Sequence, residues 1–208
     1  MEKETHWSKF ASDFEQQCNY VAGKQDMNII RNRLSGLGKL QNTLELGCGP
    51  GTYSRILAEQ SDDFFATDFS GEMVNAAKQK LKAVPNIKVE RANCFDLPFD
   101  AHSFDTVFMA NLLHVIAEPV KALIESKRVL KSGGRIIILS FTSDGMTFFN
   151  KLGMGYRYFR TWGKPPSGRT TLTVKKVQAM LELNGFEVEE SELIGNKSKA
   201  VFAKALSN

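Results

Sequence analysis

The sequence predicts a doubly wound α/β fold whose mostly parallel, seven-stranded sheet ends in an antiparallel hairpin. From residue 42 onward, short apolar runs alternate with amphipathic segments, which is the pattern of βαβ units with right-handed crossovers. A glycine-rich turn, Gly47-Cys-Gly-Pro-Gly51, follows the first apolar run. Near the end of the chain, two strand-like runs meet at Gly195-Asn196, and so short a turn makes them antiparallel neighbours.

Seven short runs are predicted as strands. They cover residues 43–46, 64–67, 87–91, 104–109, 136–141, 186–193 and 200–203. The run at 87–91 alternates in polarity, as a half-exposed strand does. The run at 104–109 is expected to be fully buried, which suits the centre of a parallel sheet.

Helices are predicted between these strands, over residues 53–59, 71–81, 119–130 and 174–183. Ser70 is the expected N-cap of the second helix, because apolar residues recur after it at helical spacing. Pro119 opens the third helix, and Lys131-Ser-Gly-Gly134 is expected to be the turn that ends it. Gly185 is expected to stop the last helix, and residues 97–103 to form a loop.

Composition excludes several classes of protein. Three scattered cysteines, Cys18, Cys48 and Cys94, are too few for a disulfide framework or a zinc site. We therefore expect no metal and a reducing, cytoplasmic location. The polar start argues against a secretory signal. The longest apolar run, at 108–116, is too short to span a bilayer, so no integral membrane segment is expected.

Charge is uneven along the chain. Residues 1–120 hold 12 Lys+Arg and 16 Asp+Glu, whereas residues 121–208 hold 15 and 7. The basic excess peaks at 145–176, with seven Lys/Arg and no acid. The aromatic residues of this segment are Phe148, Phe149, Tyr156, Tyr158, Phe159 and Trp162. Such a mixture suits an anionic aromatic ligand, a lipid surface or a nucleic acid; the alternative is a solvated helix packed on the sheet.

The glycine turn and the strand after it point to a nucleoside ligand. Glycines at 47, 49 and 51 let a ligand approach the backbone, and Thr52 stands where a dinucleotide fingerprint would need a third glycine. Asp68 closes the next apolar run, where a carboxylate can accept both hydroxyls of a ribose. Together these features resemble the class I S-adenosylmethionine (SAM)-dependent methyltransferases, which implies a Rossmann-like fold.

The resemblance extends from about Leu44 to Phe202 and is nearest to the subgroup of ubiquinone- and menaquinone-biosynthesis C-methyltransferases and many small-molecule methyltransferases. It implies SAM as cofactor and S-adenosylhomocysteine as product. It implies a single domain over residues 1–208 with four parts: a helical cap at 1–40, a SAM-binding core at 41–142, a substrate-covering insert at 143–172, and a terminal helix and hairpin at 173–208.

The resemblance also implies a cofactor site. Its residues would be Glu45, Gly47, Cys48, Gly49, Gly51, Asp68, Phe69, Met73, Asn93, Cys94 and Asn111. Glu45 would orient the amino-acid end of SAM, Asp68 would bind the ribose, and Phe69 would lie beside the adenine. Asn93 replaces the family's usual aspartate, and its carbonyl oxygen could still accept from the adenine amino group.

The acceptor side is less well defined. His114 is the first candidate for a general base, against the alternative that it is structural. The expected acceptor contacts are Phe14, His114, Tyr156, Tyr158 and Trp162. Trp7, Phe10 and Phe14 fall on one helical face, which predicts either a packing helix or a lid over the cofactor.

The first functional hypothesis is a methyltransferase that acts on a small apolar or anionic acceptor beneath the insert. The second is an RNA methyltransferase that uses the basic half as a phosphate track. A non-catalytic SAM-binding regulator is the third. A nicotinamide dehydrogenase is disfavoured by Thr52 and the terminal hairpin. Peripheral membrane contact stays open, and the sequence determines neither the methylated atom nor the oligomeric state.

Overall fold

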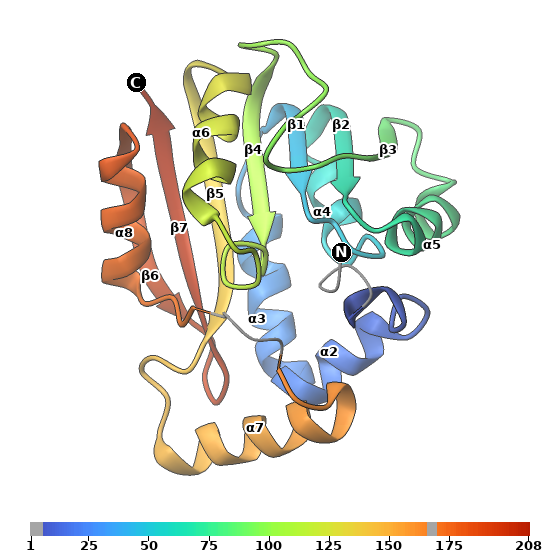
Figure 1. Ribbon diagram of the computed structural model, residues 1–208, viewed down its shortest axis with the longest axis vertical. Coiled ribbons are helices and arrows are strands. Elements are labelled where there is room, and N and C mark those ends of the chain that lie inside the picture. Colours follow the sequence, from blue (N-terminus) through green and yellow to red (C-terminus); the bar gives the residue numbers. More distant parts are fainter. Residues whose placement is uncertain (1–5, 166–169) are drawn as a thin grey trace.

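A computed structural model describes residues 6–165 and 170–208, and a seven-stranded sheet in the order β3-β2-β1-β4-β5-β7-β6 forms its centre (Figure 1). The strands are β1 (Gln41–Leu46), β2 (Ser61–Asp68), β3 (Ile87–Arg91), β4 (Phe104–Ala110), β5 (Leu130–Thr142), β6 (Phe186–Ile194) and β7 (Lys199–Ser207). The first five pair in parallel, and β7 is antiparallel to both β5 and β6. The predicted sheet with its reversed hairpin is confirmed.

Helices pack on both faces of the sheet. They are α2 (Phe14–Ala22), α3 (Lys24–Ser35), α4 (Ser54–Ala58), α5 (Gly71–Leu81), α6 (Pro119–Val129), α7 (Phe148–Trp162) and α8 (Val174–Leu183). One apolar core joins α3, α4 and α5 to the sheet through Leu34, Leu57 and Ala77. A second core joins α6 and α8 to the other face through Leu123 and Leu181. This is the doubly wound arrangement expected from βαβ alternation.

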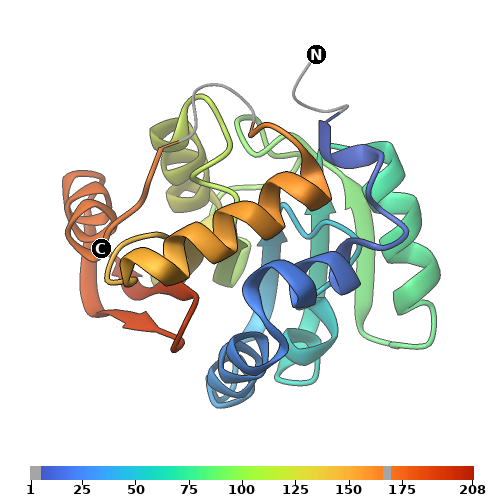
Figure 2. The ribbon, with the colours of Figure 1, turned by 90° about the horizontal axis from the view of Figure 1, so that it is seen from below.

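The carboxyl ends of the parallel strands all lie at one end of the molecule. In Figure 1 the arrowheads of β1, β2 and β4 point toward α2 and α7, and Figure 2 views that end directly. The chain order reverses between β1 and β4, the two neighbours at the middle of the sheet. Ligands of open α/β sheets bind in the crevice at such a switch point.

The predicted turn at Lys131-Ser-Gly-Gly134 is wrong. These residues belong to β5, which begins at Leu130 directly after α6. The pairing with β4 shifts register between Phe104 and Thr106, so the glycines form a bulge inside the strand. A Cβ at Gly134 would lie 2.8 Å from the carbonyl oxygen of Lys131, and this explains the glycine.

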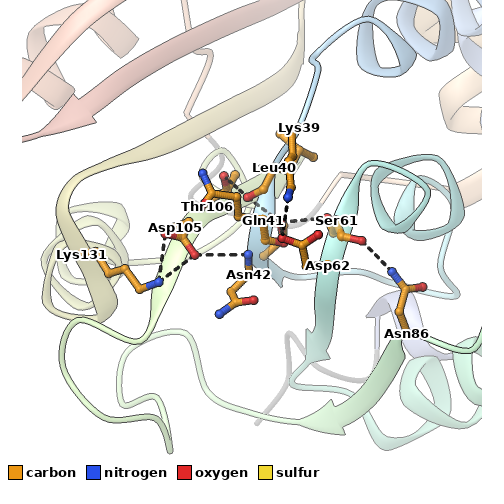
Figure 3. A network of polar contacts seen from close by, with 11 residues as sticks. Lys39, Leu40, Gln41, Asn42, Ser61, Asp62, Asn86, Asp105, Thr106 and Lys131 are labelled. Carbon is orange, nitrogen blue, oxygen red and sulfur yellow. Dashed lines mark hydrogen bonds and ion pairs between the residues drawn. The ribbon is translucent and has the colours of Figure 1, made fainter.

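A polar network ties the strands together at the end of the sheet opposite α7 (Figure 3). The carboxylate of Asp105 accepts from the Lys131 ammonium at 2.8–2.9 Å and from the backbone N–H of Asn42 at 3.3 Å. The Thr106 hydroxyl donates to the carbonyl oxygen of Leu40 at 2.9 Å. These bonds link the starts of β1, β4 and β5, so the polar side chains at this end of the sheet stabilise the fold.

A buried carboxylate anchors the N-terminal helices to the C-terminal hairpin. Asp26 of α3 is only 4% exposed. Its oxygens accept from the backbone N–H groups of Asn196 at 2.6 Å, Lys197 at 3.2 Å and Ser198 at 2.8 Å. The loop between β6 and β7 is therefore held by a residue 170 positions earlier in the chain. The predicted division of the chain into four parts stays a prediction.

Candidate active site

A cavity of about 970 Å³ lies at the carboxyl ends of the central strands and is lined by residues of the strand ends, α2 and α7. Its volume is at the upper end of the roughly 300–1,000 Å³ usual for small-molecule sites. The strand ends supply polar side chains such as Glu45 and Asp68, whereas α2 and α7 supply mostly apolar ones such as Val21 and Met154. The cavity therefore has room for a nucleoside-sized molecule and a second, less polar one.

The glycine turn after β1 supplies backbone to the cavity wall. Gly47 and Gly49 lie in the wall and have positive φ angles of 71° and 55°. A Cβ at Gly49 would meet only the Met73 sulfur, at 4.0 Å, so its outer side is open. Gly51 lies outside the wall, and a Cβ there would come within 2.7 Å of Leu81. The glycine at 51 thus serves the packing of α5, in contrast to its expected contact with a cofactor.

Glu45 is a buried carboxyl in the cavity wall. It is 1% exposed, and the Ser54 hydroxyl donates to it at 2.5 Å. Burial raises the pKa of Glu45 to about 7, the hydrogen bond from Ser54 opposes that rise, and the nearby negative charge of Asp68 adds to it. The buried Glu45 carboxyl favours a cationic ligand group. A positive charge beside it would offset the free-energy cost of burying the negative charge of the carboxylate.

Asp68 joins the glycine turn to the start of α5. One oxygen of Asp68 accepts from the N–H of Gly49 at 2.8 Å, and the other accepts from the N–H of Ser70 at 2.9 Å. The Ser70 hydroxyl in turn accepts from the N–H of Met73, so the predicted N-cap is confirmed. These bonds hold the carboxylate at the cavity wall.

The remaining expected cofactor residues also lie in the wall, but two of them have backbone partners. The carbonyl oxygen of the Asn93 side chain accepts from the N–H of Phe95 at 3.1 Å. That of Asn111, whose φ is 56°, accepts from the N–H of Phe141 at 2.8 Å. An adenine amino group would share the Asn93 oxygen with this backbone bond. Phe69, half exposed, and Met73, buried, complete the set.

The cysteines are suited to packing rather than nucleophilic chemistry. Burial raises the pKa of Cys18 to about 12 and that of Cys94 to about 11, and it holds the pKa of Cys48 well above its usual range. All three therefore carry a thiol at neutral pH, and the thiolate is the nucleophilic form. This agrees with their interpretation as small packing residues.

Aromatic rings from the N-terminal segment and from α7 meet at the cavity. The ring of Trp162 lies 5.6 Å from that of Trp7 and 5.9 Å from that of Phe14. Tyr158 contacts Trp162 at 5.0 Å, and all four rings line the cavity. The predicted single helical face from Trp7 to Phe14 is wrong, because residues 9–13 form turns and Phe14 begins α2. The rings of Trp7 and Phe14 instead pack against Trp162 of α7.

Tyr156 lies outside the cavity wall. Its side chain is on the outer face of α7, 61% exposed, and its hydroxyl accepts from Arg160. This contradicts its predicted contact with an acceptor in this cavity. His114, by contrast, is buried in the wall, and its Nδ1 lies 2.8 Å from the hydroxyl of the buried Ser140.

Sequence reasoning missed several residues of the wall, among them Thr52, Lys151 and Met154. The hydroxyl of Thr52 is buried, and among the described residues it has no hydrogen-bond partner. Lys151 and Met154 of α7 also line the cavity. The position of Thr52 directly after the glycine turn was the available signal. Its orphaned hydroxyl, together with Glu45 and Asp68, fits a ligand that carries an ammonium group, hydroxyls and a carboxylate, as SAM does.

Residues 44–138 match the methyltransferase domain family. The chain is 39% identical over 103 residues to the demethylmenaquinone methyltransferase of Clavibacter sepedonicus, covering 50% of this chain and 42% of that one. It is 35% identical over 115 residues to the ubiquinone/menaquinone biosynthesis C-methyltransferase of Geotalea daltonii, covering 52% and 49%. The matched part is less than half the length of either relative.

The crystal structure of a SAM-dependent methyltransferase from Aquifex aeolicus has the same fold, with a TM-score of 0.73 over 97% of this chain and 98% of that one, at 21% identity. Residues 44–138 therefore carry a methyltransferase domain, and the chain shares the fold of a SAM-dependent methyltransferase. Over about half of its length the sequence is similar to these two methyltransferases of quinone biosynthesis. SAM is the cofactor of SAM-dependent methyltransferases such as the Aquifex aeolicus protein.

Within residues 6–165 and 170–208, no helix is both long and apolar enough to cross a bilayer. No group of three or more His, Cys, Asp or Glu side chains there could hold a metal ion.

Proposed function

We propose that this protein transfers the methyl group of SAM to a small apolar or anionic acceptor, with a quinol or phenol ring as the favoured class. One observation carries the proposal: a single cavity joins the polar strand ends to an aromatic wall built from the N-terminal segment and α7. The names of the matched relatives, demethylmenaquinone and ubiquinone/menaquinone methyltransferases, support the acceptor class.

Bound SAM would supply a methyl group on a positively charged sulfur. Glu45, Asp68 and Thr52 would hold the cofactor through its ammonium, ribose and carboxylate groups. Trp7, Trp162 and their neighbours would exclude water and orient the acceptor, and alignment and desolvation are the protein's main contributions to such a transfer. The apolar part of the cavity favours a catalyst over a non-catalytic SAM-binding regulator, whose acceptor pocket would be filled.

Calorimetric titration with SAM, S-adenosylhomocysteine and NADH tests the cofactor. We expect micromolar binding of both adenosyl compounds and none of NADH. Methyl transfer from labelled SAM to small quinols, phenols and purified RNA then tests the acceptor. If the methyl label appears on RNA and not on quinols or phenols, the result favours the second hypothesis, in which the basic half of the chain forms a phosphate track. Cytoplasmic location stays a prediction.

Binding of SAM should release a proton from Glu45. The free carboxyl, with its pKa raised to about 7, is about half protonated at pH 7. A ligand ammonium group beside it lowers that pKa, so the affinity for SAM should rise with pH until the pH exceeds about 7. Calorimetry in buffers of different ionisation enthalpy should show release of roughly half a proton at pH 7.

The matched variant for this measurement is Glu45→Gln, which keeps the shape of the side chain and removes its titration. It should bind SAM more weakly and without net proton release. Equal proton release by the wild type and the variant would mean that another group titrates on binding.

His114 is our candidate base for an acceptor that must lose a proton. The variant His114→Asn should lower turnover of a phenol acceptor roughly a hundredfold to ten-thousandfold, while its affinity for SAM stays within about twofold. His102, which lies on an exposed loop outside the cavity wall, offers the control His102→Asn. Unchanged turnover in the His114 variant would assign His114 a purely structural role.

A further inference from the structure

The outer face of α7 is an exposed apolar surface. Five large side chains make up what we call the α7 outer patch: Phe148, Phe149, Leu152, Tyr156 and Phe159. Each is at least 61% exposed. Residues 148, 152, 156 and 159 follow one another at spacings of four, four and three, so they form one stripe along the helix. A contiguous stripe of this kind marks an interaction surface.

The segment that carries the patch is basic and has no acidic residue of its own. Residues 145–176 include seven Lys/Arg and neither Asp nor Glu. Lys151, Arg160 and Lys164 are exposed, and within the described part of the chain no ion pair joins any of them to an acid. Positive charge beside aromatic rings is complementary to a surface that is negative outside and apolar beneath.

The patch also adjoins the cavity. Figure 2 shows α7 lying across the end of the molecule where the central strands finish. The opposite flank of the helix lines the cavity through Met154, Tyr158 and Trp162. Phe159 belongs to both surfaces, since it is 65% exposed and also lines the cavity. The apolar surface therefore continues from the outside of the helix to the cavity mouth.

We propose that the α7 outer patch docks this protein onto a bilayer that contains anionic lipid. The phenylalanine rings enter the boundary between headgroups and acyl chains, and the cations lie among the negative headgroups. If the proposed methyl transfer also holds, an apolar acceptor dissolved in the bilayer would reach the cavity beside Phe159. The docking itself does not depend on the reaction.

A second copy of the chain fits this surface less well than a bilayer does. A two-fold symmetric dimer places the same patch against itself. Because residues 145–176 hold cations and no acid, Lys151, Arg160 and Lys164 of both copies would face one another without acidic partners from this segment. A bilayer with anionic lipid supplies both the apolar layer and the compensating charge.

The test is co-sedimentation with vesicles of phosphatidylcholine, alone or mixed with phosphatidylglycerol. We expect binding to the mixed vesicles at least about tenfold tighter than to phosphatidylcholine alone, and weaker at high salt. The double variant Phe148→Ser/Phe149→Ser should lose about tenfold or more in binding to the mixed vesicles. The variant Arg160→Gln/Lys164→Gln should lose most of the preference for phosphatidylglycerol.

A matched control is Leu183→Ser, which removes an apolar side chain that is 86% exposed at the end of α8. It should bind vesicles as the wild type does. Calorimetric binding of SAM should be unchanged in every variant, and this checks folding and separates failure of docking from failure of the proposed function. Equal vesicle binding by the wild type and the double phenylalanine variant would overturn the proposal. So would a dimer in sedimentation equilibrium that the same double substitution abolishes.

Discussion

Replacing Asp68 with alanine should weaken binding of SAM by about 3 kcal/mol, roughly 150-fold. The carboxylate is expected to bind the ribose, and it also accepts from the N–H groups of Gly49 and Ser70. Its loss therefore removes a ligand contact and releases two backbone segments of the cavity wall at once. The variant should be measured by calorimetry with both SAM and S-adenosylhomocysteine.

Asp62→Ala is the matched control, because Asp62 belongs to the same strand, is exposed and pairs with Lys39 at the far end (Figure 3). Its affinity for SAM should equal that of the wild type. Unchanged affinity in a folded Asp68 variant would show that the ribose binds elsewhere.

Asp26→Ala should lower the free energy of unfolding by about 4 kcal/mol. Three N–H groups of the loop between β6 and β7 lose their charged acceptor, and the loop is the link between the hairpin and α3. Because β7 pairs with both β5 and β6, a loosened loop weakens an edge of the sheet that holds the second core. The midpoint of urea denaturation measures the effect.

The exposed Asp13, whose side chain makes no capping bond at the start of α2, provides the control Asp13→Ala. That variant should unfold within about 0.5 kcal/mol of the wild type. If the Asp26 variant unfolds at the wild-type midpoint, the three backbone bonds contribute little to stability.

Strand and helix positions followed closely from local pattern. The helix at 174–183 and the strand at 87–91 have the predicted bounds. The predicted bounds of a strand are wrong where its hydrogen-bonded pairing with a neighbouring strand extends beyond the apolar run. β2 begins at Ser61, three residues before its predicted start, and β7 continues to Ser207. Backbone hydrogen bonds to a neighbouring strand do not require an apolar side chain, so hydropathy underestimates such strands.

The sequence predicted one set of site residues, and the structure shows that only part of this set lines the cavity. Gly51 and Tyr156 lie outside the cavity wall, whereas Thr52 and Lys151 lie in it. A motif records which residues are adjacent in the chain but not which side chains face a cavity. The rotation of α7 decides between Tyr156 and Tyr158, and that rotation depends on rings contributed by the N-terminal segment.

By itself the sequence determined the order of the strands, the reversed hairpin and the methyltransferase domain, because periodicity, turn residues and motifs are local properties of the chain. Only the tertiary structure decided that Asp68 holds two backbone segments, that Asp26 holds the hairpin, and that one flank of α7 covers the cavity while the other is exposed. Each of these depends on groups distant in sequence that only the folded chain brings within contact distance.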